Sequence, residues 1–60
     1  MNNIELWSFW IENSTGDRVQ VHWLSKELVQ YEKAKKHPKE ERTVKTLRHF
    51  TFLQDFTKEI

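Results

Sequence analysis

Hydrophobic and polar positions along the first part of the chain predict two β-strands. Residues 4–11 are mostly aromatic or β-branched, with few helix formers, which favours a strand. Residues 18–24 alternate strictly, with the valines and Trp23 on one face and polar side chains on the other. Turn-forming residues at 12–17 separate the two segments and include the only glycine, Gly16. We therefore predict a β-hairpin.

The predicted first strand is apolar on both of its faces. Leu6 and Trp10 lie on one face, and Trp7 lies on the other. A sheet of antiparallel strands commonly keeps one face in water, so the second apolar face needs a cover. One interpretation is that a helix or the C-terminal segment covers it. The other is that Leu6, Trp10 and also Phe50 form a docking face for a partner, either a larger protein or a second copy of the chain.

Helix-forming residues dominate the next segment, at positions 26–37. Ser25 precedes them as a candidate N-cap, and Leu28 and Tyr31 lie on one side at helical spacing. Pro38 disfavours the helical conformation at the residue before it. We expect a helix that ends at position 37.

The pattern of the C-terminal part supports two alternatives. Residues 43–53 alternate as a strand would, with threonines that favour this conformation. Residues 51–60 could instead form a short helix capped by Thr51, with Phe52, Phe56 and Ile60 along one stripe. We predict one α+β domain spanning residues 1–60, with element order ββαβ: a hairpin, one packed helix and a third strand. The alternative is a fragment of an all-β sandwich.

Length and composition narrow the class of protein. A chain of 60 residues buries only about 60% of the surface that its unfolded form exposes, so it makes at most one domain and leaves little room for an enclosed catalytic pocket. It has no cysteine, which excludes disulfides and thiolate metal sites and fits a reducing compartment. No apolar stretch approaches the length of about 20 residues that a membrane helix requires. We expect a soluble, cytoplasmic protein.

Charge is segregated along the chain, although the net charge is only +1. Between positions 33 and 48, seven basic residues face two acidic ones, which gives +5, while the remainder carries three basic and seven acidic residues, which gives −4. Such asymmetry suggests an oriented surface or an acidic partner. The candidates for contacts to a partner or to phosphates, called the basic band below, are Lys33, Lys36, Arg42, Lys45 and Arg48.

Part of the chain, about residues 11–55, resembles the β-domain of the von Hippel–Lindau family. That domain opens with Asn, any residue, then Ser or Thr, followed by an alternating strand that ends in Trp, as Asn13-Ser14-Thr15 and Trp23 do here. Tyr31, Pro38 and His49 resemble the later tyrosine, proline and histidine positions of the family, and Asp55 follows the histidine by six residues, as in the family.

The resemblance implies a groove that binds a hydroxyproline-containing peptide. In this sequence the groove would be lined by Trp23, Tyr31 and His49. The chain departs from the family in several places: Lys39 stands where the family has the glycine of a Pro-Gly turn, and Thr51 stands where it has a tryptophan. In addition, the segment between Trp23 and Pro38 is predicted as helix, where the family has strand.

The sequence offers no arrangement that indicates catalysis or a cofactor. The histidines, His22, His37 and His49, are too far apart in sequence to form the close ligand pairs of most zinc sites. Catalytic cysteines are excluded, and one glycine cannot build a glycine-rich phosphate loop. We predict no enzyme activity, no metal and no cofactor.

Non-catalytic binding is the function that these patterns favour. A larger protein is the expected partner, and a small inhibitor or adaptor, such as phages encode, would fit the size of the chain. The alternative is nucleic-acid binding, in which the basic band contacts phosphates while Trp10 and Phe50 stack on bases.

Overall fold

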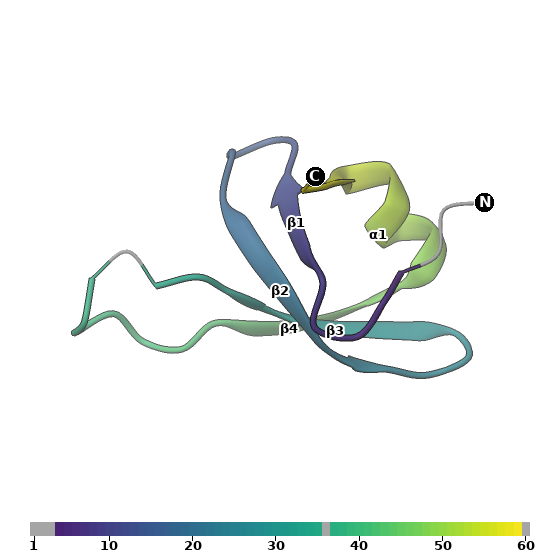
Figure 1. The fold of residues 1–60 in the computed structure, drawn as a ribbon, viewed down its shortest axis with the longest axis horizontal. Helices are drawn as coiled ribbons and strands as arrows, with labels where there is room; N and C mark the ends of the chain where they lie inside the picture. Colours follow the sequence, from purple (N-terminus) through teal and green to yellow (C-terminus); the bar gives the residue numbers. More distant parts are fainter. Residues whose placement is uncertain (1–3, 36, 60) are drawn as a thin grey trace.

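The computed structural model describes residues 4–35 and 37–59, which form one sheet and one helix (Figure 1). The strands are β1 (Phe9–Glu12), β2 (Arg18–Leu24), β3 (Leu28–Lys33), β4 (Val44–Arg48) and β5 (Phe56–Lys58), and the helix is α1 (His49–Asp55). The predicted α+β class, a small antiparallel sheet with one packed helix, is confirmed.

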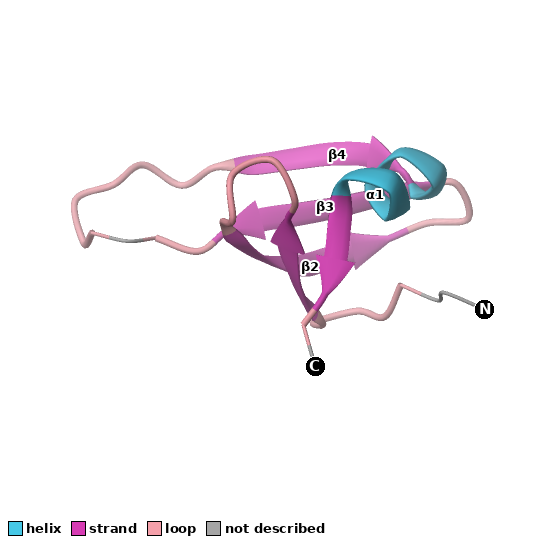
Figure 2. Ribbon diagram, turned by 90° about the horizontal axis from the view of Figure 1, so that it is seen from above, coloured by secondary structure: helices cyan, strands magenta, loops and turns pink. Residues whose placement is uncertain are grey.

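The described strands form a five-stranded antiparallel sheet in the order β4-β3-β2-β1-β5. The first four strands follow one another along the chain, so each pairs with its neighbour in sequence. The last strand, β5, returns across the sheet to pair with β1, with Trp10 opposite Lys58. Helix α1 connects the two edges and lies over one face of the sheet (Figure 2). We call this covered side the inner face and the opposite side the outer face.

The predicted N-terminal hairpin is present as β1 and β2, and β2 has the predicted bounds. Its turn closes with a hydrogen bond of 2.8 Å from the Glu12 N–H to the Asp17 carbonyl. Gly16 has a φ of 76°, which a residue without a Cβ adopts at little cost. The first strand begins at Phe9, later than expected, because residues 5–8 form a separate turn.

The predicted helix at residues 26–37 is wrong, since residues 28–33 of this segment form β3. Ser25 Oγ accepts a hydrogen bond of 3.0 Å from the Leu28 N–H, as an N-cap would, but here it stabilises a tight turn between two strands. Val29 and Tyr31 are both buried on the inner face, between β2 and β4. Tertiary burial of these two side chains overrides the helix propensity of their neighbours.

The C-terminal part contains a strand and a helix, each with other bounds than predicted, and residues 56–58 of the predicted helix form β5. The alternating residues form β4 up to Arg48, and the chain then turns directly into α1 without a side-chain cap. The helix starts before Thr51, so the predicted cap is not used, and it ends at Asp55. Phe52 and Phe56 do face the core, while Ile60 lies outside the described residues.

An aromatic cluster between the sheet and α1 forms most of the core. Phe52 of the helix is fully buried and stacks on Phe56 at 4.4 Å between ring centroids. The indole of Trp10 meets Phe52 edge-on at 5.0 Å. Burial of rings of this size is the main source of stability for so short a chain. The buried residues of the cluster are Trp10, Val19, Val21, Val29, Tyr31, Phe52 and Phe56.

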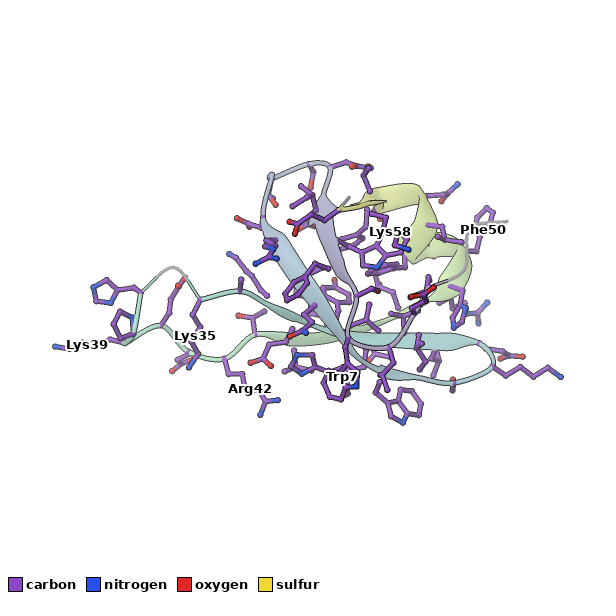
Figure 3. The ribbon with its side chains drawn as sticks, in the orientation of Figure 1. Trp7, Lys35, Lys39, Arg42, Phe50 and Lys58 are labelled. Atoms are coloured by element: carbon purple, nitrogen blue, oxygen red, sulfur yellow. The ribbon has the colours of Figure 1, made fainter. Side chains whose placement is uncertain are left out.

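The connection between β3 and β4, residues 34–43, projects from the body of the molecule (Figure 1). We call it the arm. Lys35, Lys39 and Arg42 project from it into solvent (Figure 3). The arm therefore places much of the positive charge at one end of an elongated molecule, whose extents are 36 × 20 × 17 Å.

Candidate functional site

Trp10 belongs to the core and not to an exposed face, so its predicted role in docking or base stacking is wrong. Only 3% of its surface is exposed. Its indole Nε1–H donates a hydrogen bond of 2.8 Å to Ser8 Oγ, and this hydroxyl donates in turn to the Glu5 carbonyl at 2.6 Å. Because the polar end of the ring is satisfied inside the protein, the whole side chain is available for packing on Phe52.

The chain of hydrogen bonds from Trp10 stabilises a turn at residues 5–8 that presents Trp7. The Ser8 N–H donates to the Glu5 carbonyl at 3.2 Å, which closes a β-turn. Trp7, the third residue of this turn, has a φ of 69°, a value that type II turns usually give to glycine. For a bulky side chain this left-handed conformation costs about 1–3 kcal/mol.

Three hydrogen bonds hold Trp7 in this conformation against β2. Its N–H donates to the Val21 carbonyl at 2.8 Å, and the Val21 N–H donates to the Ser8 carbonyl at 3.0 Å. The side-chain amide of Gln20 donates to the Trp7 carbonyl at 3.1 Å. The ring remains 56% exposed and lies below the sheet, opposite α1 (Figure 3). A strained backbone thus presents a large aromatic ring to solvent.

A β-bulge places a second tryptophan on the same outer face. Val21 pairs with Tyr31, but Trp23 pairs with Gln30, so His22 is the extra residue. The shift moves Trp23 away from the inner face, where strict alternation would have put it beside the valines. Its side chain is 47% exposed.

His22 connects Trp7 to the arm through a polar network. Its ring centroid lies 5.3 Å from that of Trp7, and Nδ1 lies 3.2 Å from Glu32 Oε2. The other carboxylate oxygen of Glu32 accepts a hydrogen bond of 2.7 Å from Arg42 Nε. The network therefore fixes both a ring of the outer face and a cation of the arm. We call Trp7, His22 and Trp23 the outer aromatic face.

The part of the sheet around this face has further apolar and polar features. Leu28 and Val44 share the outer side by register and are 38% and 41% exposed. On the side of β1, Phe9 is covered by the Arg18 guanidinium, 3.8 Å from the ring centroid, and Glu59 binds this guanidinium. A shallow hollow of about 180 Å³ is lined by Phe9, Gln20, His22, Glu32, Lys33, Ala34 and Lys35.

The other predicted docking residues, Leu6 and Phe50, are exposed but lie on different elements. Leu6 is 46% exposed in the turn before Trp7. Phe50 is 71% exposed at the start of α1, on the side of the sheet that the helix covers (Figure 3). The face predicted from Leu6, Trp10 and Phe50 is therefore divided between the turn, the core and the helix.

The basic band is partly neutralised by carboxylates. Lys33 Nζ lies 3.2 Å from Asp17 Oδ2, and Arg42 is bound to Glu32. Lys45 and Arg48 are exposed on β4, and Lys36 lies outside the described residues. The exposed cations of the described part are thus concentrated on the arm and on β4.

The residues of the groove implied by the family resemblance do not meet. Trp23 lies on the outer face, whereas Tyr31 is 6% exposed in the core. His49 Nε2 lies 2.9 Å from the Ser25 carbonyl and 3.1 Å from the Leu28 carbonyl, a position that ties the start of α1 to the β2–β3 turn. Burial raises the pKa of the Tyr31 hydroxyl, and the carboxylates of Glu12 and Asp55 raise it further.

Trp7 is the candidate residue that sequence patterns missed. The pattern placed it in a regular strand, and neither glycine nor proline marks the turn that presents it. The sequence feature that could have indicated this turn is Ser8, a small polar residue within an otherwise apolar segment. Its hydroxyl joins the core indole of Trp10 to the turn.

The described residues also bear on metal binding and membrane insertion. Among residues 4–35 and 37–59, no group of three histidine or acidic side chains is arranged to hold a metal ion. The helix of these residues, α1, has seven residues and is too short to cross a membrane. No protein family, curated protein or solved structure matches this chain significantly. The geometry of the outer aromatic face is therefore the basis for assigning a function.

Proposed function

We propose that this protein is a non-catalytic binding protein, an inhibitor or adaptor, that recognises a larger protein through its outer aromatic face. The observation that carries the proposal is the position of Trp7. An exposed indole is held at a φ of 69° by hydrogen bonds from β2, although glycine would suit the turn better. Backbone strain of this kind concentrates at sites of function.

The composition of the face supports a protein partner. Tryptophan and arginine are the residues most enriched among those that dominate the energy of protein interfaces. Trp7 and Trp23 provide two large rings, and Leu28 and Val44 are further exposed apolar side chains on the same side of the sheet. The aromatic core on the inner face is already covered by α1, so these exposed rings are not needed to complete it.

The test compares exposed aromatic residues on opposite sides of the sheet. The partner is captured from lysate of the cells that make the protein, after nuclease treatment, then identified, purified and titrated by calorimetry. We expect Trp7→Ala and Trp23→Ala each to weaken binding by about 30-fold, or roughly 2 kcal/mol. Phe50→Ala is the matched control, because its ring is more exposed than either indole but lies on the helix side. It should bind as the wild type does.

Two results would contradict the proposal. One is full affinity in the Trp7→Ala, Trp23→Ala double variant while circular dichroism shows an intact fold. The other is loss of affinity in Phe50→Ala alone, which would assign the binding surface to the opposite side.

Nucleic-acid binding is the second candidate, and the arm is the observation that favours it. Lys35 and Lys39 extend from the body, and Arg42 is linked through Glu32 to the ring that contacts Trp7. Cations beside exposed rings are the elements of a single-strand binding surface. A fluorescently labelled single-stranded oligonucleotide would then bind with an affinity that falls steeply as salt is raised. Salt-tolerant binding to a protein partner would exclude this candidate.

A further inference from the structure

Strand β4 forms one margin of the sheet, and its backbone has hydrogen-bonding groups directed away from β3. It is the end member of the strand order (Figure 2). The Lys33 N–H donates to the Thr43 carbonyl at 3.0 Å, and the His49 N–H donates to the Glu27 carbonyl at 3.1 Å. In an antiparallel ladder the residues that bond across it alternate. The odd-numbered residues of β4 therefore bond to β3, and the even-numbered residues direct their N–H and C=O groups outward.

The outward groups belong to Val44, Thr46 and Arg48, whose side chains are exposed. This stretch has neither a proline nor a bulge, features that commonly block an exposed edge. The opposite edge, β5, is only three residues long. Of the two edges of the described sheet, β4 thus offers the longer row of backbone donors and acceptors.

Charge around β4 determines what can occupy this edge. Lys45 and Arg48 lie on the strand itself, and the arm adds Lys35, Lys39 and Arg42 at its beginning, so these cations outnumber the acidic residues nearby, which are Glu40 and Glu41 of the arm and Glu32, the partner of Arg42. Edge pairing with a second copy would place two such positive regions side by side, which like charges oppose. An acidic strand would be attracted by the same charges.

From this register and charge we propose that the β4 edge accepts an extended, acidic segment of a partner protein as a sixth strand. In an antiparallel segment of five residues centred on Thr46, the first residue would lie opposite position 48 and the last opposite position 44. Acidic residues suit the positions opposite Arg48 and Lys45, and β-branched residues suit those opposite Leu47 and Val44. The best-matched sequence is therefore Glu-Val-Thr-Glu-Val. Backbone hydrogen bonds would supply affinity, and the two acids would supply specificity.

This inference rests on the proposed function in one respect, that the partner is a protein. It concerns a different surface, since the β4 edge binds through backbone groups and the outer aromatic face through rings. The two can therefore fail separately.

The experiment measures amide hydrogen exchange by NMR with two capped peptides, Glu-Val-Thr-Glu-Val and the control Lys-Val-Thr-Lys-Val. With the acidic peptide at about ten times its dissociation constant, we expect exchange at Val44, Thr46 and Arg48 to slow by about tenfold. Exchange at Lys45 and Leu47, which already bond to β3, should change little. The basic peptide should protect none of these amides.

Two variants at one position test the role of the backbone. Thr46→Pro removes an outward N–H without removing a bond to β3, so it should abolish peptide binding. Thr46→Ala keeps the N–H and should bind the peptide. Trp7→Ala should also bind it, because that ring is not part of the edge. Loss of the natural partner in Trp7→Ala with peptide binding intact would support both proposals.

Several outcomes would overturn the inference, and they do not depend on Thr46→Pro folding. Equal protection by both peptides would show that charge does not determine binding. Protection confined to residues outside β4 would show that the peptide does not bind at this edge. Concentration-dependent protection of the same amides without peptide, with a dimer in sedimentation, would assign the edge to a second copy. Protection by an oligonucleotide but not by the acidic peptide would assign it to nucleic acid.

Discussion

The ring of His22 lies 5.3 Å from the ring of Trp7, and its Nδ1 lies 3.2 Å from the carboxylate of Glu32. Because Glu32 also binds Arg42, the position of an exposed indole and the base of the arm depend on one partly buried carboxylate. The outer aromatic face is thus held from two directions. Backbone bonds from β2 fix the main chain of Trp7, and the polar network supports its ring.

The tryptophans should differ sharply in their importance for stability. Trp10→Ala removes a ring that is 3% exposed and packs on Phe52, and we expect a loss of about 3–5 kcal/mol. That is comparable to the whole stability of a domain of this size, so the variant should be largely unfolded. Trp7→Ala should cost no more than about 1 kcal/mol. Urea denaturation followed by circular dichroism measures both. Similar losses in the two variants would contradict the assignment of Trp10 to the core and Trp7 to the surface.

Replacement of Trp7 by glycine should relieve the strain in its turn. We expect Trp7→Gly to be more stable than Trp7→Ala by about 0.5–1 kcal/mol, because alanine retains the cost of a positive φ and glycine does not. Leu6 is the control, since it lies in the same turn without a positive φ. At this position the Leu6→Gly variant should be less stable than the Leu6→Ala variant. The four unfolding curves give the comparison, and the same order at both positions would show that Trp7 is not strained.

Glu32→Gln should loosen the network that supports the outer aromatic face. Its carboxylate contacts His22 and Arg42, and we expect a loss of about 1 kcal/mol, kept small because the Arg42 side chain is 63% exposed. Denaturation at low and high salt measures this loss, which should shrink as salt screens the charge pair. Glu41→Gln, in the arm, is the control and should leave stability unchanged. A salt-independent loss would indicate that packing, not charge, is responsible.

Tyr31, the single tyrosine, should titrate above its ordinary pKa of 10.0. Burial and the nearby carboxylates raise the pKa in the folded protein, so folding favours the neutral hydroxyl. This contribution to stability is fully present below pH 10.0 and is lost as pH rises through the folded pKa. Tyrosinate absorbance measured against pH, with the urea-unfolded chain as control, tests it. Identical midpoints in the two states would contradict the buried position.

The sequence was informative where local pattern and tertiary burial agree. The turn at Gly16 and the alternation of β2 predicted the hairpin, because both features depend on neighbouring residues. The α+β class is confirmed, although the helix on which it rested was predicted at residues 26–37 and lies instead at His49–Asp55. At β3 local propensity and tertiary burial disagree. Good helix formers surround Val29 and Tyr31, but pairing with the strands on both sides makes the segment extended.

The candidate site depended on events that alternation does not encode. The bulge at His22 is a one-residue change of register that moved Trp23 to the outer face. Alternation did place Trp7 and Trp10 on opposite faces, but it did not indicate that α1 covers the face of Trp10 and leaves Trp7 exposed. The sequence indicated that more aromatic residues were present than the core needed. Which of them are exposed was evident only from the structure.

The contribution of α1 and β5 to the core has a consequence for synthesis on the ribosome. Phe52 and Phe56 come late in the chain, and β1 gains its second neighbour only when β5 arrives. Until these segments leave the exit tunnel, the inner face of the earlier strands has no cover, and Trp10 is left open to water or to a chaperone. Folding of this protein should therefore be a late, single event that follows translation of almost the whole sheet.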